Sequence, residues 1–151
     1  TGYEANAPAP GKRPLSSMTP TFMVSPDRIA VLGTPGGSRI ITMVLLGVLG
    51  YADGLGAQAV AALPRYHHQW KPDVVQAETG AFDPAVAARL RAMGHVLHMP
   101  EDAVSGRASS HVWGNLQTVM WDRRRGALEA GGDPRHPESS AQVRQASQAA
   151  P

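Results

Sequence analysis

The amino-acid sequence predicts an α+β fold with a largely antiparallel sheet. Short β-favouring runs occur in adjacent pairs near both ends of the chain, as in hairpins, and the segments between them lack the regular strand–helix alternation of parallel sheets. No internal repeat is visible. With 151 residues, 42% of them hydrophobic, the chain has the size of one domain, which buries roughly two thirds of its unfolded surface.

Glycine and proline divide the chain into the expected elements. Pro26-Asp27 separates two β-favouring runs and predicts a hairpin turn. Asp83-Pro84 supplies a helix cap followed by proline at the first helical position, and Gly94 is a helix stop. In chain order we expect strands at 20–25 and 28–33, helices at about 39–51 and 57–63, a loop or extended segment at 65–70, a strand at 74–78, a helix from 84 to about 93, a strand at 95–99, and a hairpin of strands 116–121 and 127–130.

The first expected helix is the most hydrophobic segment. Its residues 40–49 are apolar nearly all round, so we expect the helix to be buried between a sheet and another helix. Ser38 stands directly before this run and is the expected N-cap.

Composition excludes several classes of site and partner. The chain has no cysteine, which excludes disulfides, cysteine-ligated zinc and thiol catalysis. Its formal net charge is only +2 and its arginines are scattered, so no nucleic-acid partner is expected. The cluster Arg123–Arg125 is typical of a solvated hairpin turn. The longest apolar run is too short to span a bilayer, and no targeting segment is recognisable.

The two ends differ from the rest of the chain. Residues 1–13 are rich in alanine, proline and glycine, and residues 136–151 are rich in serine, glutamine and alanine without an apolar period. We expect a flexible lead-in at 1–13, a folded region at 14–135 and a flexible tail at 136–151. The start at Thr1 rather than methionine hints that further residues precede it or lie in another chain.

Two segments offer ways to hold an anion. Gly36-Gly37 presents consecutive backbone amides between an expected strand and a buried helix, where the helix dipole is positive. The same glycines equally suit a plain tight turn. The phosphate-binding patterns GxxxxGK[ST] and GxGxxG are absent. Ser16 and Ser17 lie in a segment stiffened by prolines on both sides, and their hydroxyls suit a carboxylate, although a serine pair is more often part of a turn.

The histidines do not form a recognisable metal site. His67 and His68 are adjacent and therefore point in different directions on a helix or a strand, and no HExxH or other ligand spacing is present. Structural or surface roles are the simpler interpretation. No metal and no cofactor are expected, and the absence of a GxSxG motif argues against a serine hydrolase.

Four segments in order resemble the gamma-glutamyltransferase family, within its small, C-terminal subunit. The resemblance spans residues 12–135, and four collinear motifs make chance similarity improbable. They are Lys12-Arg13-Pro14-Leu15-Ser16-Ser17-Met18-Thr19-Pro20-Thr21, Gly33-Thr34-Pro35-Gly36-Gly37-Ser38-Arg39-Ile40-Ile41-Thr42, Ala62-Leu63-Pro64-Arg65-Tyr66-His67-His68-Gln69-Trp70-Lys71-Pro72-Asp73 and Gly132-Asp133-Pro134-Arg135.

The resemblance implies an N-terminal-nucleophile hydrolase with an αββα sandwich, made as a precursor that cuts itself into two subunits. A new N-terminal threonine attacks the gamma-glutamyl amide of glutathione or a related donor, and water, an amino acid or a peptide then takes the acyl group. The motifs place Ser16 and Ser17 on the donor's alpha-carboxylate and the amides of Gly36 and Gly37 in the oxyanion hole. The His-His-Gln-Trp segment matches family architecture rather than catalysis.

The resemblance also implies what else the site needs. Thr1 is not the expected nucleophile, because the family's threonine opens a different motif and lies much farther upstream of the serine pair. The expected partners are the preceding part of the small subunit and the large subunit, and the expected location is periplasmic or extracellular. We therefore expect the chain alone to be inactive. The segment 105–115 and the tail after His136 depart from the family pattern.

Three other interpretations stay open. The chain is also compatible with a non-catalytic or decayed relative that acts as a binding module, with a relative that cleaves cephalosporin side chains, and with a small anion-binding domain that depends on the glycines alone. If strands of the family fold lie outside this chain, its sheet is expected to expose apolar surface and unpaired edges.

Overall fold

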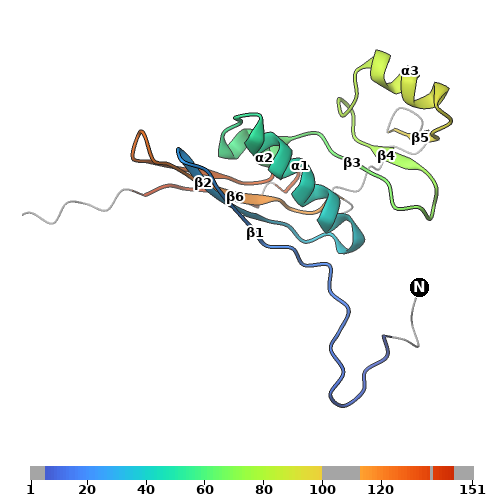
Figure 1. The fold of residues 1–151 in the computed structure, drawn as a ribbon, viewed down its shortest axis with the longest axis horizontal. Helices are drawn as coiled ribbons and strands as arrows, with labels where there is room; N and C mark the ends of the chain where they lie inside the picture. Colours follow the sequence, from blue (N-terminus) through green and yellow to red (C-terminus); the bar gives the residue numbers. More distant parts are fainter. Residues whose placement is uncertain (1–5, 100–112, 137, 145–151) are drawn as a thin grey trace, which may run out of the picture.

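Two helices cover one face of a four-stranded antiparallel sheet in the computed structural model, which describes residues 6–99, 113–136 and 138–144 (Figure 1). The strands lie in the order β1-β2-β6-β7, and every neighbouring pair is antiparallel. They are β1 (Thr21–Val24), β2 (Arg28–Gly33), β6 (Gln117–Asp122) and β7 (Ala127–Gly131). The predicted α+β class with a largely antiparallel sheet is confirmed.

Both predicted hairpins are present. Ser25 closes the first turn, since its amide and hydroxyl both donate to the carbonyl of Arg28, at 2.8 and 3.1 Å. The arginine cluster forms the second turn, between β6 and β7. There the exposed Arg124 pairs with Asp27 at 2.6 Å, which ties the tips of the two hairpins together.

The two faces of the sheet differ in what covers them. Ala30 and Leu32 of β2 point to the helices and are buried, as is Met120, which lies opposite Ala30 in β6. These side chains form the main core with apolar residues of the two helices. Alternation along the strands directs Val31 and its neighbours to the other face.

Helix α1 (Ile40–Ala52) begins one residue later than an N-cap at Ser38 requires. A 3₁₀ turn, η1 (Gly37–Arg39), precedes it, and Arg39 occupies the N-cap position without a side-chain cap. The expectation that Ser38 caps the helix is therefore wrong. Its hydroxyl donates instead to Oε1 of Gln69 at 2.6 Å.

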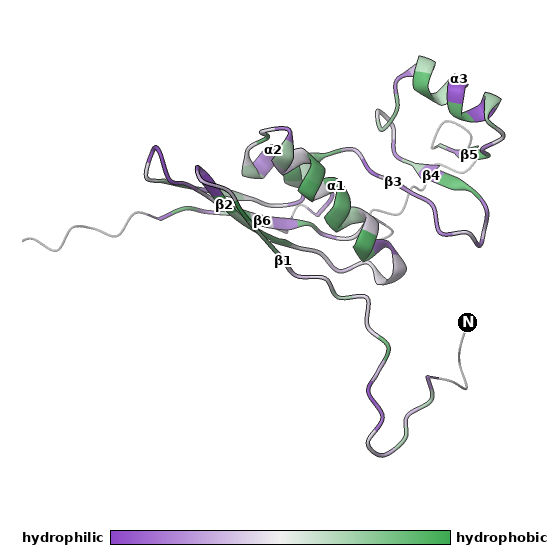
Figure 2. Ribbon diagram, viewed as in Figure 1, coloured by the Kyte–Doolittle hydropathy of each residue, from purple (hydrophilic) through white to green (hydrophobic). Residues whose placement is uncertain are grey.

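Helix α1 is buried on one side only, which corrects the expectation of burial all round. Ile40 and Val44 belong to the core beneath the helix, whereas Ile41, Leu45 and Leu49 are about half exposed. The second helix, α2 (Ala57–Ala62), packs against β6 and β7 beside α1 and does not cover this outer side. Figure 2 colours much of α1 as hydrophobic, and the half-exposed residues belong to this apolar stretch.

A second, three-stranded sheet lies beyond the N-terminal end of α1 (Figure 1). It consists of β3 (Tyr66–His67), β4 (Val75–Ala77) and β5 (Leu97–His98), and β4 and β5 run parallel. Helix α3 (Pro84–Ala92) packs on it through a small core of its own. Asp83 caps this helix as predicted, accepting from the Val86 amide at 2.9 Å.

The uncovered face of the four-stranded sheet is apolar. Phe22 and Val24 of β1 are 73% and 68% exposed, and Val31, Val119 and Trp121 of β2 and β6 lie on the same face. Such a face is larger and more continuous than scattered surface hydrophobics. This is the exposed apolar surface expected for a sheet that packs against something outside this chain.

A buried ionic cluster joins the two sheets. Arg65, just before β3, donates through Nη2 to Oδ2 of Asp133 at 2.6 Å, and both side chains are almost completely buried. The other carboxylate oxygen of Asp133 accepts from the amide and Nη1 of Arg135, each at 3.0 Å. Arg135 in turn forms a two-pronged pair with Glu78, which also accepts from the Arg65 amide at 2.8 Å.

The charges in this cluster are balanced by specific contacts. Burial raises the pKa of Asp133, but hydrogen bonds from the amides of Arg135 and Leu116, with the charge of Arg65, outweigh it and hold that pKa below its ordinary value. Burial lowers the pKa of Arg65, and the charge of Arg135 lowers it further. Burial opposes the charge on Arg135 as well, but Glu78 and Asp133 raise its pKa overall.

Candidate active site

The turn at Gly36-Gly37 lies between the end of β2 and η1. Gly36 has φ 148° and Gly37 has φ 57°, both in the region that side-chain-bearing residues avoid. A Cβ on Gly37 would meet nothing within 4 Å, so the turn opens onto free space. Neither glycine amide donates a hydrogen bond to another described residue. Two adjacent N–H donors are therefore free to bind an anion.

The electrostatic setting of this turn favours an anion. It precedes the N-terminus of the thirteen-residue helix α1, whose dipole is positive at that end. The first turn of the helix contains no acidic residue, and Arg39 lies within the 3₁₀ turn. Successive amides of this kind form a concave anion-binding surface.

Ser16 and Ser17 lie in the extended segment that leads to β1 (Figure 1). The Met18 amide donates to Oγ of Ser16 at 3.1 Å, which fixes the hydroxyl oxygen and leaves its proton available. The hydroxyl of Ser17 has no partner among the described residues. Thr19 donates to the Ser17 carbonyl at 2.9 Å and so stiffens the segment.

A pocket of about 220 Å³ links the two segments. It is lined by Met18, Thr19 and Pro20, which follow the serine pair, and by Gly33 and Thr34, which precede the glycine turn. The segments next to the serine pair and the glycine turn therefore lie close together, where β1 begins and β2 ends. The structure records no direct contact between the serine hydroxyls and the glycine amides in the described part of the chain.

Thr34 of the glycine motif and two residues that the sequence did not single out, Gly114 and Asn115, hold the glycine turn. The hydroxyl of Thr34 accepts from the Asn115 amide at 3.0 Å and donates to the Pro35 carbonyl at 2.7 Å. Gly114 has φ 71°, and a Cβ there would lie 2.3 Å from the Pro35 oxygen. The glycine in Trp113-Gly114-Asn115 was a visible signal, but its contact partner lies about eighty residues away.

The neighbouring histidines have different environments. His67 is 3% exposed and its two ring nitrogens contact Thr42 and Gln69. His68 is exposed and pairs with Asp73 at 2.8 Å. The described residues contain no group of three side chains placed to hold a metal ion. His111 lies outside the described residues, as do Thr1 and most of the divergent segment before Asn115.

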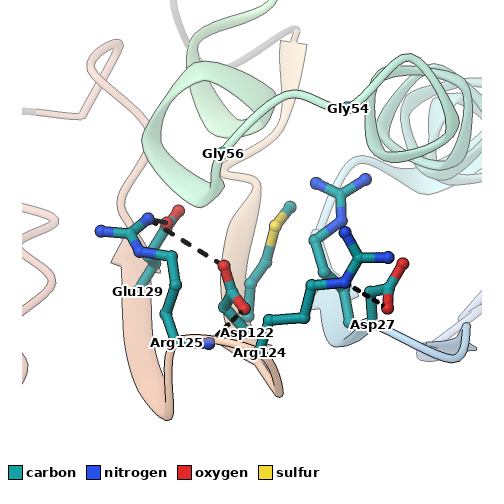
Figure 3. A pocket seen from close by; sticks show the side chains of 9 residues that line it. Asp27, Gly54, Gly56, Asp122, Arg124, Arg125 and Glu129 are labelled. Carbon is teal, nitrogen blue, oxygen red and sulfur yellow. Dashed lines mark hydrogen bonds and ion pairs between the residues drawn. The ribbon is translucent and has the colours of Figure 1, made fainter.

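A second pocket, of about 380 Å³, lies at the other end of the strands (Figure 3). Arg124 and Arg125 point into it beside Asp27, Asp122 and Glu129. Each arginine faces a carboxylate, at 2.6 Å for Arg124 and 4.0 Å for Arg125. These exposed pairs compensate one another, so the pocket has no net charge with which to attract a ligand.

Comparison with known proteins identifies the family. The sequence profile of gamma-glutamyltranspeptidase matches residues 2–143. The chain belongs to the gamma-glutamyltranspeptidase family. It is 40% identical over 136 residues to the glutathione hydrolase proenzyme of Escherichia coli K12, covering 89% of this chain and 21% of that protein. It is 43% identical over 102 residues to the proenzyme of Pseudomonas sp. strain A14, covering 66% and 18%.

Solved gamma-glutamyltranspeptidases confirm the predicted fold. The T380A mutant of the Helicobacter pylori enzyme superposes with a TM-score of 0.71 at 31% identity, covering 88% of this chain and 68% of that one. The N-terminal-nucleophile hydrolase fold expected from the motifs is therefore confirmed. The chain spans about a fifth of the length of the curated relatives it matches. None of its described helices is both long and apolar enough to cross a membrane.

Proposed function

We propose that this chain supplies the oxyanion hole and the carboxylate clamp of a gamma-glutamyl-transferring site. The amides of Gly36 and Gly37, which donate to no other described residue, carry the proposal. The donor is glutathione or a related gamma-glutamyl compound. The nucleophilic threonine and the large subunit lie outside these 151 residues, so the chain alone is inactive.

The chemistry gives each group a defined task. The threonine hydroxyl attacks the gamma-carbonyl carbon, and the carbonyl oxygen becomes a tetrahedral oxyanion as the C–O bond forms. The two glycine amides donate to this oxyanion. The amide C–N bond then breaks, the leaving amine takes the proton that the threonine hydroxyl gave up, and a gamma-glutamyl ester remains. Water or an acceptor amine attacks that ester, which returns the threonine hydroxyl.

Two features of the described residues support this assignment. The amides are preorganised by backbone angles that need glycine, so no reorganisation is required as the charge develops. One such donor contributes on the order of 3 kcal/mol to the transition state. The hydroxyls of Ser16 and Ser17 remain able to donate to a carboxylate from a segment that leads to the same end of the sheet.

The open apolar face of the sheet supports the proposal that polypeptide outside these 151 residues completes the fold. An αββα sandwich requires a second sheet on that face, and Phe22, Val24 and Val119 are exposed where such a sheet would pack. We place the preceding part of the small subunit and the large subunit as partners in a heterodimer. A periplasmic or extracellular location belongs to the same proposal, with no cofactor.

A chimeric proenzyme tests the proposal. The aligned region of the Escherichia coli relative is replaced by this chain, and release of p-nitroaniline from gamma-glutamyl-p-nitroanilide is measured. Gly37→Ala keeps the backbone N–H but disfavours the φ of 57° that aims it, so it is expected to lower kcat by up to about 100-fold through displacement of the donor. The matched control is Gly126→Ala, because Gly126 has φ 60° and equally open surroundings but lies in the distant hairpin turn. It is expected to leave kcat unchanged.

The serine pair gives a second readout. Replacing Ser16 and Ser17 together by alanine is expected to raise KM for the donor at least tenfold, whereas Ser140→Ala, an exposed serine elsewhere, leaves it unchanged. Equal effects of Gly37→Ala and Gly126→Ala would refute the oxyanion assignment. Turnover by the isolated chain that is lost on Thr1→Ala would refute the external nucleophile.

A non-catalytic relative and a cephalosporin-cleaving relative remain the alternatives. An active chimera excludes the first. The second predicts that glutaryl amides are cleaved in preference to gamma-glutamyl amides. The two substrates differ only in the alpha-amino group, which a glutaryl group lacks. The gamma-glutamyl donor is the stronger choice, since the matched relatives are glutathione hydrolase proenzymes.

A further inference from the structure

Four side chains connect helix α1, strand β3 and the glycine turn. Oε1 of Gln69 accepts from Ser38 Oγ at 2.6 Å and contacts Nε2 of His67 at 3.0 Å. On the far side of the same imidazole, Nδ1 lies 2.8 Å from Oγ1 of Thr42. The side-chain nitrogen Nε2 of Gln69 donates to the Lys71 carbonyl at 3.0 Å, which fixes the orientation of the side-chain amide group.

These contacts define the protonation of His67. Oε1 of Gln69 only accepts, so the proton must be on Nε2 of the imidazole. In the neutral imidazole Nδ1 is then an acceptor, and the Thr42 hydroxyl donates to it. The imidazole is 3% exposed, so water cannot readily replace either partner. The chain of hydrogen bonds therefore has one direction, from Thr42 through His67 to Gln69, where Ser38 also donates.

The Ser38 end of this series of hydrogen bonds adjoins the proposed oxyanion hole. Ser38 directly follows Gly37, and both belong to the 3₁₀ turn. The hydroxyl of Thr34 holds the opposite side of the same turn through the Asn115 amide. The turn is thus restrained on one side by the contact of the Thr34 hydroxyl with the Asn115 amide. On the other side Gln69 holds Ser38, and Arg39 of the same turn donates to Oε1 of Gln76 and lies over the Trp113 ring.

We propose that Gln69, oriented by His67 and Thr42, is a positioning residue that holds the amides of Gly36 and Gly37 in place through Ser38. The effect of Gln69 on turnover rests on the proposed function. The restraint of the glycine turn by Gln69 can be measured in this polypeptide without it. Glycines at positive φ are intrinsically mobile, so donors built from them need external restraint to be preorganised. A displacement of about 1 Å at such donors lowers turnover by as much as 100-fold.

The restraint is measured first in the 151-residue chain labelled with ¹⁵N. In the unmodified chain, the His67 ring is expected to show a single tautomer protonated at Nε2. Gln69→Ala is expected to lower the backbone order parameters of Gly36, Gly37 and Ser38 from about 0.85 to about 0.6. His68→Ala is the matched control, because that neighbouring side chain points to solvent and pairs with Asp73. Unchanged order parameters in Gln69→Ala would overturn the proposal.

Thr42 provides an independent variant within the helix. Thr42→Val removes the donor to Nδ1 but keeps the shape, and Thr42→Ser keeps the hydroxyl. In the valine variant the His67 ring is expected to populate both tautomers. In the serine variant it is expected to keep the single tautomer protonated at Nε2. A His67 ring protonated at Nδ1 in the unmodified chain would contradict the proposed direction of the hydrogen bonds.

Kinetics of the chimeric proenzyme then separate positioning from function. Gln69→Ala is expected to lower kcat between about tenfold and 100-fold with KM within twofold, and adding Ser38→Ala is expected to cause no further loss. Multiplicative losses, or a loss confined to KM, would overturn the positioning role. An inactive unmodified chimera would refute the proposed function, and the order parameters would still decide the restraint.

Discussion

Replacing Asp133 with asparagine tests how much the buried ionic cluster stabilises the fold. The change keeps the shape of the side chain but removes the charge that faces Arg65, which is 1% exposed. Four hydrogen bonds converge on this carboxylate, from Arg65, from the Leu116 amide and twice from Arg135. Leaving one partner of a buried pair uncompensated costs about 3–5 kcal/mol. Because asparagine keeps one acceptor oxygen, we expect about 3 kcal/mol.

The loss should depend on pH in a defined direction. The pKa of Asp133 is lowered in the folded chain, so the carboxylate contributes its full stabilisation above the unfolded pKa of about 3.9. That contribution disappears as the pH falls through the folded pKa. The difference between the unmodified chain and Asp133→Asn is therefore expected to be constant between about pH 5 and 8 and to shrink below about pH 4.

Urea unfolding followed by tryptophan fluorescence at pH 7, 5 and 3 measures this difference. The control is Asp27→Asn, which removes the exposed pair with Arg124 and is expected to cost less than about 1 kcal/mol. The reasoning fails if Asp133→Asn and Asp27→Asn have equal effects at pH 7. It also fails if the effect of Asp133→Asn grows toward acid pH.

Three further predictions concern other parts of the fold. Arg28→Ala should cost about 1.5–3 kcal/mol in urea unfolding, because the guanidinium donates to the Tyr51 carbonyl at 2.7 Å and stacks on that ring. Gly114→Ala should lower kcat of the chimera at least tenfold, since its Cβ would lie 2.3 Å from the Pro35 oxygen and displace the glycine turn; unchanged kcat would contradict this. Phe22→Lys on the open face should reduce self-association in size-exclusion chromatography while changing stability by less than about 0.5 kcal/mol.

Elements governed by local signals were predictable from the sequence. The hairpin at Pro26-Asp27 and the cap at Asp83 follow from turn and capping residues that act within a few positions. The start of α1 did not follow from such signals. Ser38 has the chemistry of an N-cap, but a partner thirty-one residues away, Gln69, takes its hydroxyl, and a 3₁₀ turn replaces the cap.

The outer face of α1 shows a second limit of sequence reasoning. Ile41, Leu45 and Leu49 are as apolar as the buried side, and nothing in the helix sequence distinguishes the two sides. Which side packs depends on the sheet beneath it.

The candidate site was predictable only in its parts. Gly36-Gly37 and Ser16-Ser17 are visible as short motifs, and their assigned roles stay proposals. Gly114 and Asn115 reach the glycine turn from a distant segment, so no local pattern identifies them. Long-range contacts of this kind depend on the fold and not on spacing in the sequence.

The pairing of β2 with β6 has a consequence for how the chain folds during synthesis. About ninety residues separate the partners Arg28 and Asp122, and at roughly 5–20 residues per second the ribosome needs about 5–20 s to make them. During that interval β1 and β2 form a hairpin whose inner edge, next to Val31, has no partner strand. An unpaired apolar edge recruits other strands, so the nascent hairpin is a natural substrate for holding chaperones.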